Sequence, residues 1–226
     1  MKRADQIIQF LFDLKYPFKL PKNVGVLDVH DDALVQQACI AFYKKFYNDS
    51  GKRRIMIGIN PGRFGGGITG LPFTDPIRLE NDCGIKNDWQ KKQELSSVFM
   101  YEMMDAYGGV KKFYKDIYIT AVSPLGFVKN GINLNYYDDK KLKEQIKPFV
   151  IDCMEKQLEF GIKTDVAFCI GEGENFKYLS GLNEEQGWFR QILPVPHPRF
   201  IMQYKLKQKQ EFIDKYLRVL TSFRTK

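Results

Sequence analysis

Short apolar runs recur along the chain, and each one ends in a loop rich in glycine, proline or polar residues. Runs of this length that stop at a turn signal are typical of strands buried on both faces. Four of them stand out, at residues 54–59, 117–122, 166–170 and 191–195. We therefore expect four short buried strands, each followed by a loop.

Apolar residues at helical spacing fill the intervals between these runs. They recur around residues 7–12, 34–46, 98–104, 142–158, 176–182 and 212–220. Strands that alternate with helices predict a parallel sheet with helices on both faces. The fold class we expect is α/β, a three-layer sandwich with a central parallel four-stranded sheet. In such a sheet, ligands bind beyond the carboxyl ends of the strands, where all four loops meet.

No repeat, linker or low-complexity block divides the 226 residues, so we expect one domain over residues 1–226. Its extensions are N-terminal helices over about residues 1–50 and a basic C-terminal helix over about residues 205–226. Lysine and arginine number 35 against 27 acidic residues, a net charge of +8. Seven basic and two acidic residues lie between 205 and 226, so this segment carries +5 of that charge. The excess favours a polyanionic partner such as a nucleic acid.

Other classes of protein are excluded by what the chain lacks. No apolar run approaches the roughly 20 residues that span a bilayer, so we expect no membrane partner. The four cysteines lie far apart without a paired motif. Cysteines in this pattern are typical of reduced, buried thiols in a cytoplasmic protein, and they form no metal site. We expect a cytoplasmic monomer that uses neither a metal nor a cofactor.

The loop after the first predicted strand is the most informative segment. Residues 58–73 hold six glycines and two prolines, a composition that lets the backbone approach a ligand closely. The segment lacks both the phosphate-binding P-loop pattern and the dinucleotide-binding glycine spacing. From composition alone it is either a flexible loop or a functional loop of another kind.

The order of residues in this loop resembles the first motif of the single-strand-selective monofunctional uracil-DNA glycosylases, within the uracil-DNA glycosylase superfamily. That motif, G-M-N-P-G-P-F-G-x-x-x-T-G-x-P-F, is matched from Gly58 to Phe73 except at Ile59 and Arg63. The superfamily's second motif is a histidine-proline loop, and His197-Pro198 stands at the end of the fourth predicted strand. The resemblance covers roughly residues 54–199.

The resemblance implies a monofunctional DNA glycosylase of base-excision repair, which flips uracil or a related deaminated base out of DNA and hydrolyses its N-glycosidic bond. Such chemistry needs a positioned water and fixed donors for the departing anionic base. The implied catalytic residues are Asn60, which holds the water, and His197, which donates to the base. Residues expected to bind the flipped base or its phosphate are Ile59, Gly62, Phe64, Phe73 and Ser123.

The basic charge also supports contacts with DNA at this rim, where the candidate loops meet. Arg63, Lys129 and Arg199 are the phosphate candidates, and Phe200 is a candidate wedge for the vacated stack, with Ile201 or Met202 as alternatives. His30, which lies in an acidic cluster, is expected to be a surface residue at a helix start.

One departure from the family concerns recognition of the base. The family has an asparagine that reads the uracil edge three residues before a Pro-Leu pair, and here that position is Ala121. Either another group reads the edge, from Thr120, Ser123, Asn130 or backbone amides, or the substrate preference differs.

Two alternatives to a glycosylase remain open. The first is a DNA- or nucleotide-binding protein of the same fold with altered or lost activity, which Ala121 keeps possible. The second is a nucleotide hydrolase or transferase that binds phosphates with the glycine-rich loop. It needs acidic ligands for Mg²⁺ near the strand ends, where Asp75 is the nearest candidate.

Overall fold

A computed structural model describes residues 2–223 and contains the predicted central sheet. The strands β2 (Arg53–Gly58), β3 (Ile117–Ala121), β6 (Ile162–Ile170) and β7 (Gln191–Val195) are all parallel, in the order β3-β2-β6-β7. The predicted strands and fold class are confirmed, although β6 begins four residues before the apolar run at residue 166. After the buried Ile162, its next three residues are polar and at least partly exposed, so they do not extend the apolar run.

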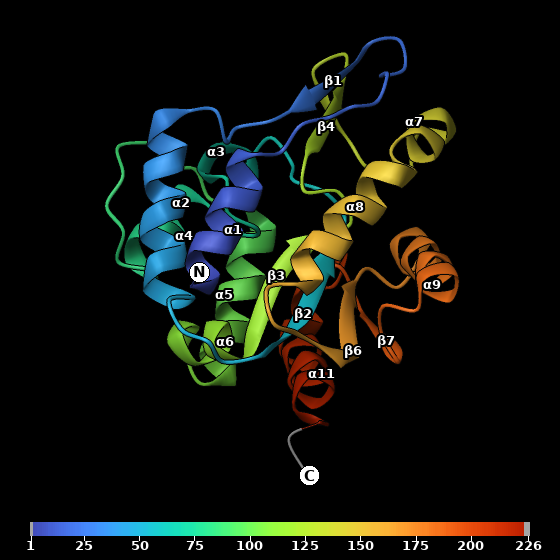
Figure 1. Ribbon diagram of the computed structural model, residues 1–226. Coiled ribbons are helices and arrows are strands. Elements are labelled where there is room, and N and C mark those ends of the chain that lie inside the picture. The colour runs from blue at the N-terminus through green and yellow to red at the C-terminus, as the bar shows by residue number, and fades with distance from the viewer. Residues whose placement is uncertain (1, 224–226) are drawn as a thin grey trace.

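Helices flank the sheet on both faces (Figure 1). Of these helices, α2 (Ala33–Phe46), α5 (Leu95–Tyr107) and α6 (Val110–Asp116) lie on one side, and α8 (Lys147–Leu158) and α9 (Glu174–Gln186) on the other. The remaining helices are α1 (Arg3–Phe12), α3 (Gly66–Thr69), α4 (Pro76–Asn81), α7 (Lys140–Gln145), α10 (Pro198–Tyr204) and α11 (Lys209–Thr221). A short 3-10 helix, Leu206–Gln208, precedes α11.

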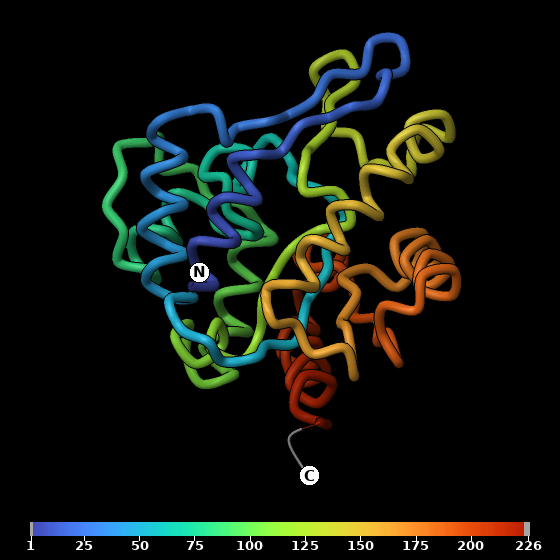
Figure 2. Tube along the Cα trace, in the orientation of Figure 1, coloured from blue at the N-terminus to red at the C-terminus, as the bar shows by residue number. Residues whose placement is uncertain are grey.

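A second sheet was not predicted. Three short antiparallel strands, β1 (Val24–Leu27), β4 (Gly126–Lys129) and β5 (Ile132–Leu134), pair in the order β1-β4-β5. Figure 2 shows β1 and the β4–β5 hairpin side by side at one end of the molecule. These strands are only three or four residues long, too short for hydrophobic periodicity to reveal them.

The predicted terminal extensions pack into the body of the protein. One cluster of buried hydrophobic residues runs from Ala4 in α1 to Leu220 in α11. Arg3 is buried as well, and its guanidinium donates to the carbonyls of Phe160 and Gly51. The last residues of the predicted basic helix, 224–226, lie outside the described residues. No helix among residues 2–223 is long and apolar enough to cross a membrane.

Candidate active site

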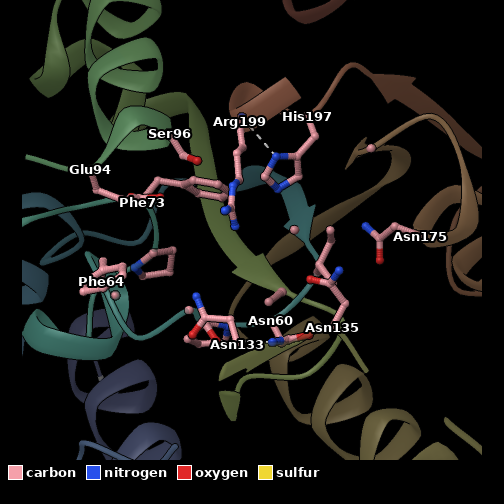
Figure 3. Close-up of a pocket in the computed structure, with 18 of the residues that line it drawn as sticks. Asn60, Phe64, Phe73, Glu94, Ser96, Asn133, Asn135, Asn175, His197 and Arg199 are labelled. Carbon is pink, nitrogen blue, oxygen red and sulfur yellow. Dashed lines mark hydrogen bonds between the residues drawn. The ribbon is translucent and has the colours of Figure 1, made fainter. Parts of the chain in front are cut away.

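The loops at the carboxyl ends of the parallel strands surround a cavity of about 900 Å³ (Figure 3). The β5 segment closes one side of it, and the N-terminus of α10 closes another. This volume is at the upper end of the roughly 300–1,000 Å³ typical of ligand sites. The cavity is large enough for a nucleotide.

The glycine-rich loop lines the cavity because its glycines let the chain fold back on itself. A Cβ on Gly67 would lie 2.2 Å from the carbonyl oxygen of Gly62, a contact that no side chain tolerates. Gly65 has a φ of +63°, and a Cβ there would lie 2.7 Å from the Glu94 carboxylate. Asn133 of β5 accepts a hydrogen bond from the Arg63 backbone N–H over 2.9 Å. The loop is therefore a fixed wall rather than a flexible segment.

Asn60 follows β2, and its amide is held by the segment after β4. Its Nδ2 donates to the carbonyls of Pro61 and Leu134, both at 3.2 Å. Its Oδ1 accepts from the backbone N–H of Tyr136 at 2.9 Å. These contacts use both amide protons and fix the orientation of the group. The second lone pair of Oδ1 remains for one further donor, such as a water O–H.

His197 follows β7 and caps the N-terminus of α10. Its Nδ1 accepts from the Arg199 backbone N–H at 3.1 Å, so the proton of the neutral ring is on Nε2. Burial, together with the nearby Arg199 charge, lowers the pKa of His197 from 6.5 to about 4. At pH 7 the imidazole is therefore neutral and offers one N–H donor at Nε2.

Phe73 provides a partly buried aromatic surface in the cavity wall, and its ring centroid lies 6.2 Å from that of His197. Its φ is +51°, an unusual value for a bulky residue, of the kind that costs roughly 1–3 kcal/mol. The ring lies against Gly58, where a Cβ would approach it to 3.3 Å. The absence of a side chain at Gly58 lets the ring lie at the end of β2.

Exposed aromatic and basic side chains surround the mouth. Phe64 is 42% exposed, and the cations of Lys92 and Arg63 lie 4.2 and 5.4 Å from its ring centroid. On α10, Phe200 and Tyr204 also line the cavity; they are 45% and 72% exposed, and their ring centroids lie 5.9 Å apart. Figure 3 shows the Arg199 side chain directed into the cavity. Aromatic faces interleaved with cations suit single-stranded nucleic acid.

A comparison with protein families identifies the chain. The model of the family described as "Uracil DNA glycosylase superfamily" matches residues 44–221. The chain belongs to the uracil DNA glycosylase superfamily. It is also similar to a solved structure titled "The crystal structure of WT Pedobacter heparinus SMUG2", with 43% identity, a TM-score of 0.97 and complete coverage of both chains. A search of curated proteins found no match. The family predicted from the two motifs is thus confirmed.

The structure brings most of the residues suggested by the superfamily motifs to this cavity. Those that line it are Asn60, His197, Ile59, Gly62, Phe64, Phe73, Arg63, Arg199 and Phe200. Ser123 lies elsewhere: it is buried behind the wall, and its hydroxyl donates to the Leu125 carbonyl at 2.8 Å. Lys129 lies on β4 and pairs with Asp139 at 2.9 Å. Within the described chain, neither Ser123 nor Lys129 lines the cavity.

Of two other candidate readers of the base, Thr120 lines the cavity but its hydroxyl is already engaged, and Asn130 is not among the lining residues. The Thr120 hydroxyl donates to Oε1 of the buried Gln157 at 2.5 Å, which ties it to α8. Asn130 lies in the turn between β4 and β5, with a φ of +51°. The expectation for His30 is wrong, because Asp32 caps α2 and His30 is buried, with Nε2 3.2 Å from the Gly70 carbonyl.

The polar residues of the wall that the sequence analysis missed include Glu94, Asn133 and Asn135. Burial raises the pKa of the Glu94 carboxyl, whose Oε2 accepts from the Ser97 hydroxyl at 2.7 Å. Asn133 and Asn135 flank the buried Leu134, and in a strand such residues share one face. This alternation was the available signal. Because the sequence analysis predicted no strand at residues 133–135, the alternation did not indicate a site.

Proposed function

We propose that this member of the superfamily is a monofunctional DNA glycosylase that removes uracil or a related deaminated base from DNA. The observation that carries the proposal is the pairing, in one cavity, of an oriented acceptor at Asn60 with an oriented donor at His197. Hydrolysis of the N-glycosidic bond needs these two functions, because a water must be aligned with the sugar while charge develops on the departing base.

Asn60 acts by position rather than as a base. Both of its amide protons are engaged by Pro61 and Leu134, so it holds the water by accepting from it at Oδ1. A carboxamide does not take the proton, but a dissociative reaction gains most from alignment of the nucleophile, which is worth several kcal/mol.

His197 stabilises the leaving base as a neutral donor. The ring proton is on Nε2, because Nδ1 accepts a hydrogen bond from the backbone N–H of Arg199. A fixed donor of this kind is typically worth about 10²–10³ in rate. Phe73 offers a face on which the flipped base stacks. This contact offsets part of the cost of unstacking the base from its neighbours in the DNA.

Direct hydrolysis, without strand cleavage by the enzyme, fits the residues of the cavity. A lyase step requires an amine that attacks the sugar. Within the described chain, the lysine of the lining is Lys92, which is exposed and whose ammonium lies over Phe64 at the rim. Asn60 and His197 themselves form no Schiff base.

The experiment that tests the proposal is a panel of oligonucleotides, single- and double-stranded, that contain uracil, hypoxanthine, xanthine or hydroxymethyluracil. We expect release of at least one of these bases, with an intact strand that breaks only on alkaline treatment. Binding of the panel without release of any base would favour the second candidate, a DNA-binding protein of the same fold. Ala121 is the observation that supports this candidate, because the family's base-reading side chain is missing.

The nucleotide hydrolase finds little support in the geometry. Asp75, its candidate ligand for Mg²⁺, accepts from the backbone N–H groups of Arg78 and Glu94, both at 2.9 Å. Both carboxylate oxygens therefore hold the ends of helices α4 and α5.

A further inference from the structure

The end of β3 presents a methyl group to the cavity. Ala121 lines the cavity at the end of β3, and its methyl side chain can neither donate nor accept a hydrogen bond. If the proposed function is right, the edge of the flipped base is read by another part of the wall. A carboxamide suits this task, because it places a donor and an acceptor side by side.

Most polar side chains of the wall are already occupied. Asn60 has one lone pair left, which the proposed water uses. Asn133 accepts from Arg63. Asn175 is buried, with its Oδ1 bonded to the Tyr136 hydroxyl and its Nδ2 to the Ile170 carbonyl. Gln93 and Gln203 line the cavity only at its exposed rim.

Asn135 differs from all of these. It is partly buried, it lines the cavity, and its side-chain amide makes no hydrogen bond within the described residues 2–223. Figure 3 shows it beside Asn60, on the side of the cavity that faces His197.

The main chain around Asn135 is fixed on both sides. Its neighbours Leu134 and Tyr136 supply the backbone groups that hold the Asn60 amide. Its own N–H donates to the Asp138 carboxylate at 3.0 Å, and its carbonyl accepts from the Asp138 N–H at 3.0 Å. The free amide is therefore carried by a rigid turn directly beside the group that positions the water.

We propose that Asn135 is the specificity-determining residue that reads the base edge, in place of the side chain missing at Ala121. Its Oδ1 accepts from a ring N–H, and its Nδ2 donates to the adjacent carbonyl. Uracil presents this pair of groups, and so does hypoxanthine. A paired contact of this kind is worth about 1–3 kcal/mol, or roughly 5- to 150-fold in discrimination.

The test combines a change in the protein with a change in the base. Asn135→Ala should lower kcat/KM for uracil in single-stranded DNA by about 5- to 150-fold. N3-methyluracil lacks the ring N–H, so wild type should already be slow on it, and Asn135→Ala should slow it no further. The matched control is Asn133→Ala, which releases the Arg63 loop and should slow both bases by the same factor. If Asn135→Ala lowers kcat/KM by the same factor for uracil and N3-methyluracil, the proposal is overturned. Backbone amides would then be the groups that contact the base edge.

A second measurement separates this proposal from the proposed function. Binding of oligonucleotides that contain uracil or N3-methyluracil needs no turnover. Wild type should prefer uracil, and Asn135→Ala should lose that preference even if no base is ever released. A preference that survives the substitution contradicts the role of Asn135, whereas absence of base release by wild type contradicts only the glycosylase.

Discussion

The backbone N–H of Arg199 donates to Nδ1 of His197 over 3.1 Å, and this one contact determines which ring nitrogen carries the proton. Because His197 also caps α10, the direction of its Nε2–H is coupled to the start of that helix. The Pro-His-Pro sequence stiffens the same turn. The donor is thus oriented before any substrate enters.

Removal of His197 should slow the reaction by an amount that depends on the leaving base. We expect His197→Ala to lower single-turnover release of uracil by about 10²–10³-fold, the usual effect of one transition-state donor. The loss should shrink for a better leaving group such as 5-fluorouracil, because less charge needs stabilising. An identical factor for both bases would mean that His197 only maintains the shape of the loop.

The neutral state of His197 has a consequence for pH dependence. Its pKa of about 4 lies well below the ordinary value of 6.5, so the ring keeps the same protonation state from pH 6 to 9. We expect the single-turnover rate of wild type to vary little with pH over that range. A loss of rate as pH rises through 7 would instead indicate a catalytic imidazolium.

Asn60→Ala should affect both chemistry and stability. Loss of the aligned water should lower single-turnover base release by about 10²-fold or more, with little change in DNA affinity. The three hydrogen bonds of the amide also disappear, each worth about 1 kcal/mol. Urea unfolding should therefore show a loss of roughly 1–3 kcal/mol. Rates are compared at a temperature where circular dichroism finds both proteins folded, and wild-type turnover by the variant would remove Asn60 from the mechanism.

Glu94 should make stability depend on pH. Burial raises the pKa of its carboxyl in the folded protein above the ordinary 4.5, so the folded state keeps this proton to higher pH than the unfolded state does. The stability that Glu94 contributes is therefore present at low pH and is lost as pH rises above about 4.5. Glu94→Gln should reduce this loss, as measured by urea unfolding at pH 4.5 and pH 8. The control is Glu144→Gln, at an exposed position of α7. If the free energy of unfolding changes between pH 4.5 and pH 8 by the same amount in Glu94→Gln and wild type, the argument is refuted.

Salt should weaken DNA binding in proportion to the phosphate contacts at the mouth. Each contact to single-stranded DNA contributes a slope of about −0.7 in log K against log salt. Arg199→Ala should make the slope shallower by about that amount, measured by fluorescence anisotropy on an undamaged oligonucleotide. Lys156→Ala is a suitable control, because Lys156 pairs with Asp152 near the far end of α8. If Arg199→Ala leaves the slope of log K against log salt unchanged, Arg199 does not contact a DNA phosphate.

The sequence predicted the central sheet well, because each of its strands is a short apolar run that ends at a turn signal. It predicted the cavity for the same reason, since parallel strands bring the loops with Asn60 and His197 to one edge. It did not predict the β1-β4-β5 sheet, whose strands are only three or four residues long. Asn133 and Asn135 therefore stayed hidden, and Ser123 was assigned to a cavity that it does not line.

The measurement that tests the central claim most directly is the release of free uracil under single-turnover conditions. Wild type, in excess over a labelled single-stranded oligonucleotide with one uracil, should release one equivalent of base and leave an intact strand with an abasic site. The His197→Ala and Asn60→Ala variants should bind the same oligonucleotide but release the base at least about 10²-fold more slowly. Tight binding by wild type without release of uracil or any other base of the panel would contradict the account.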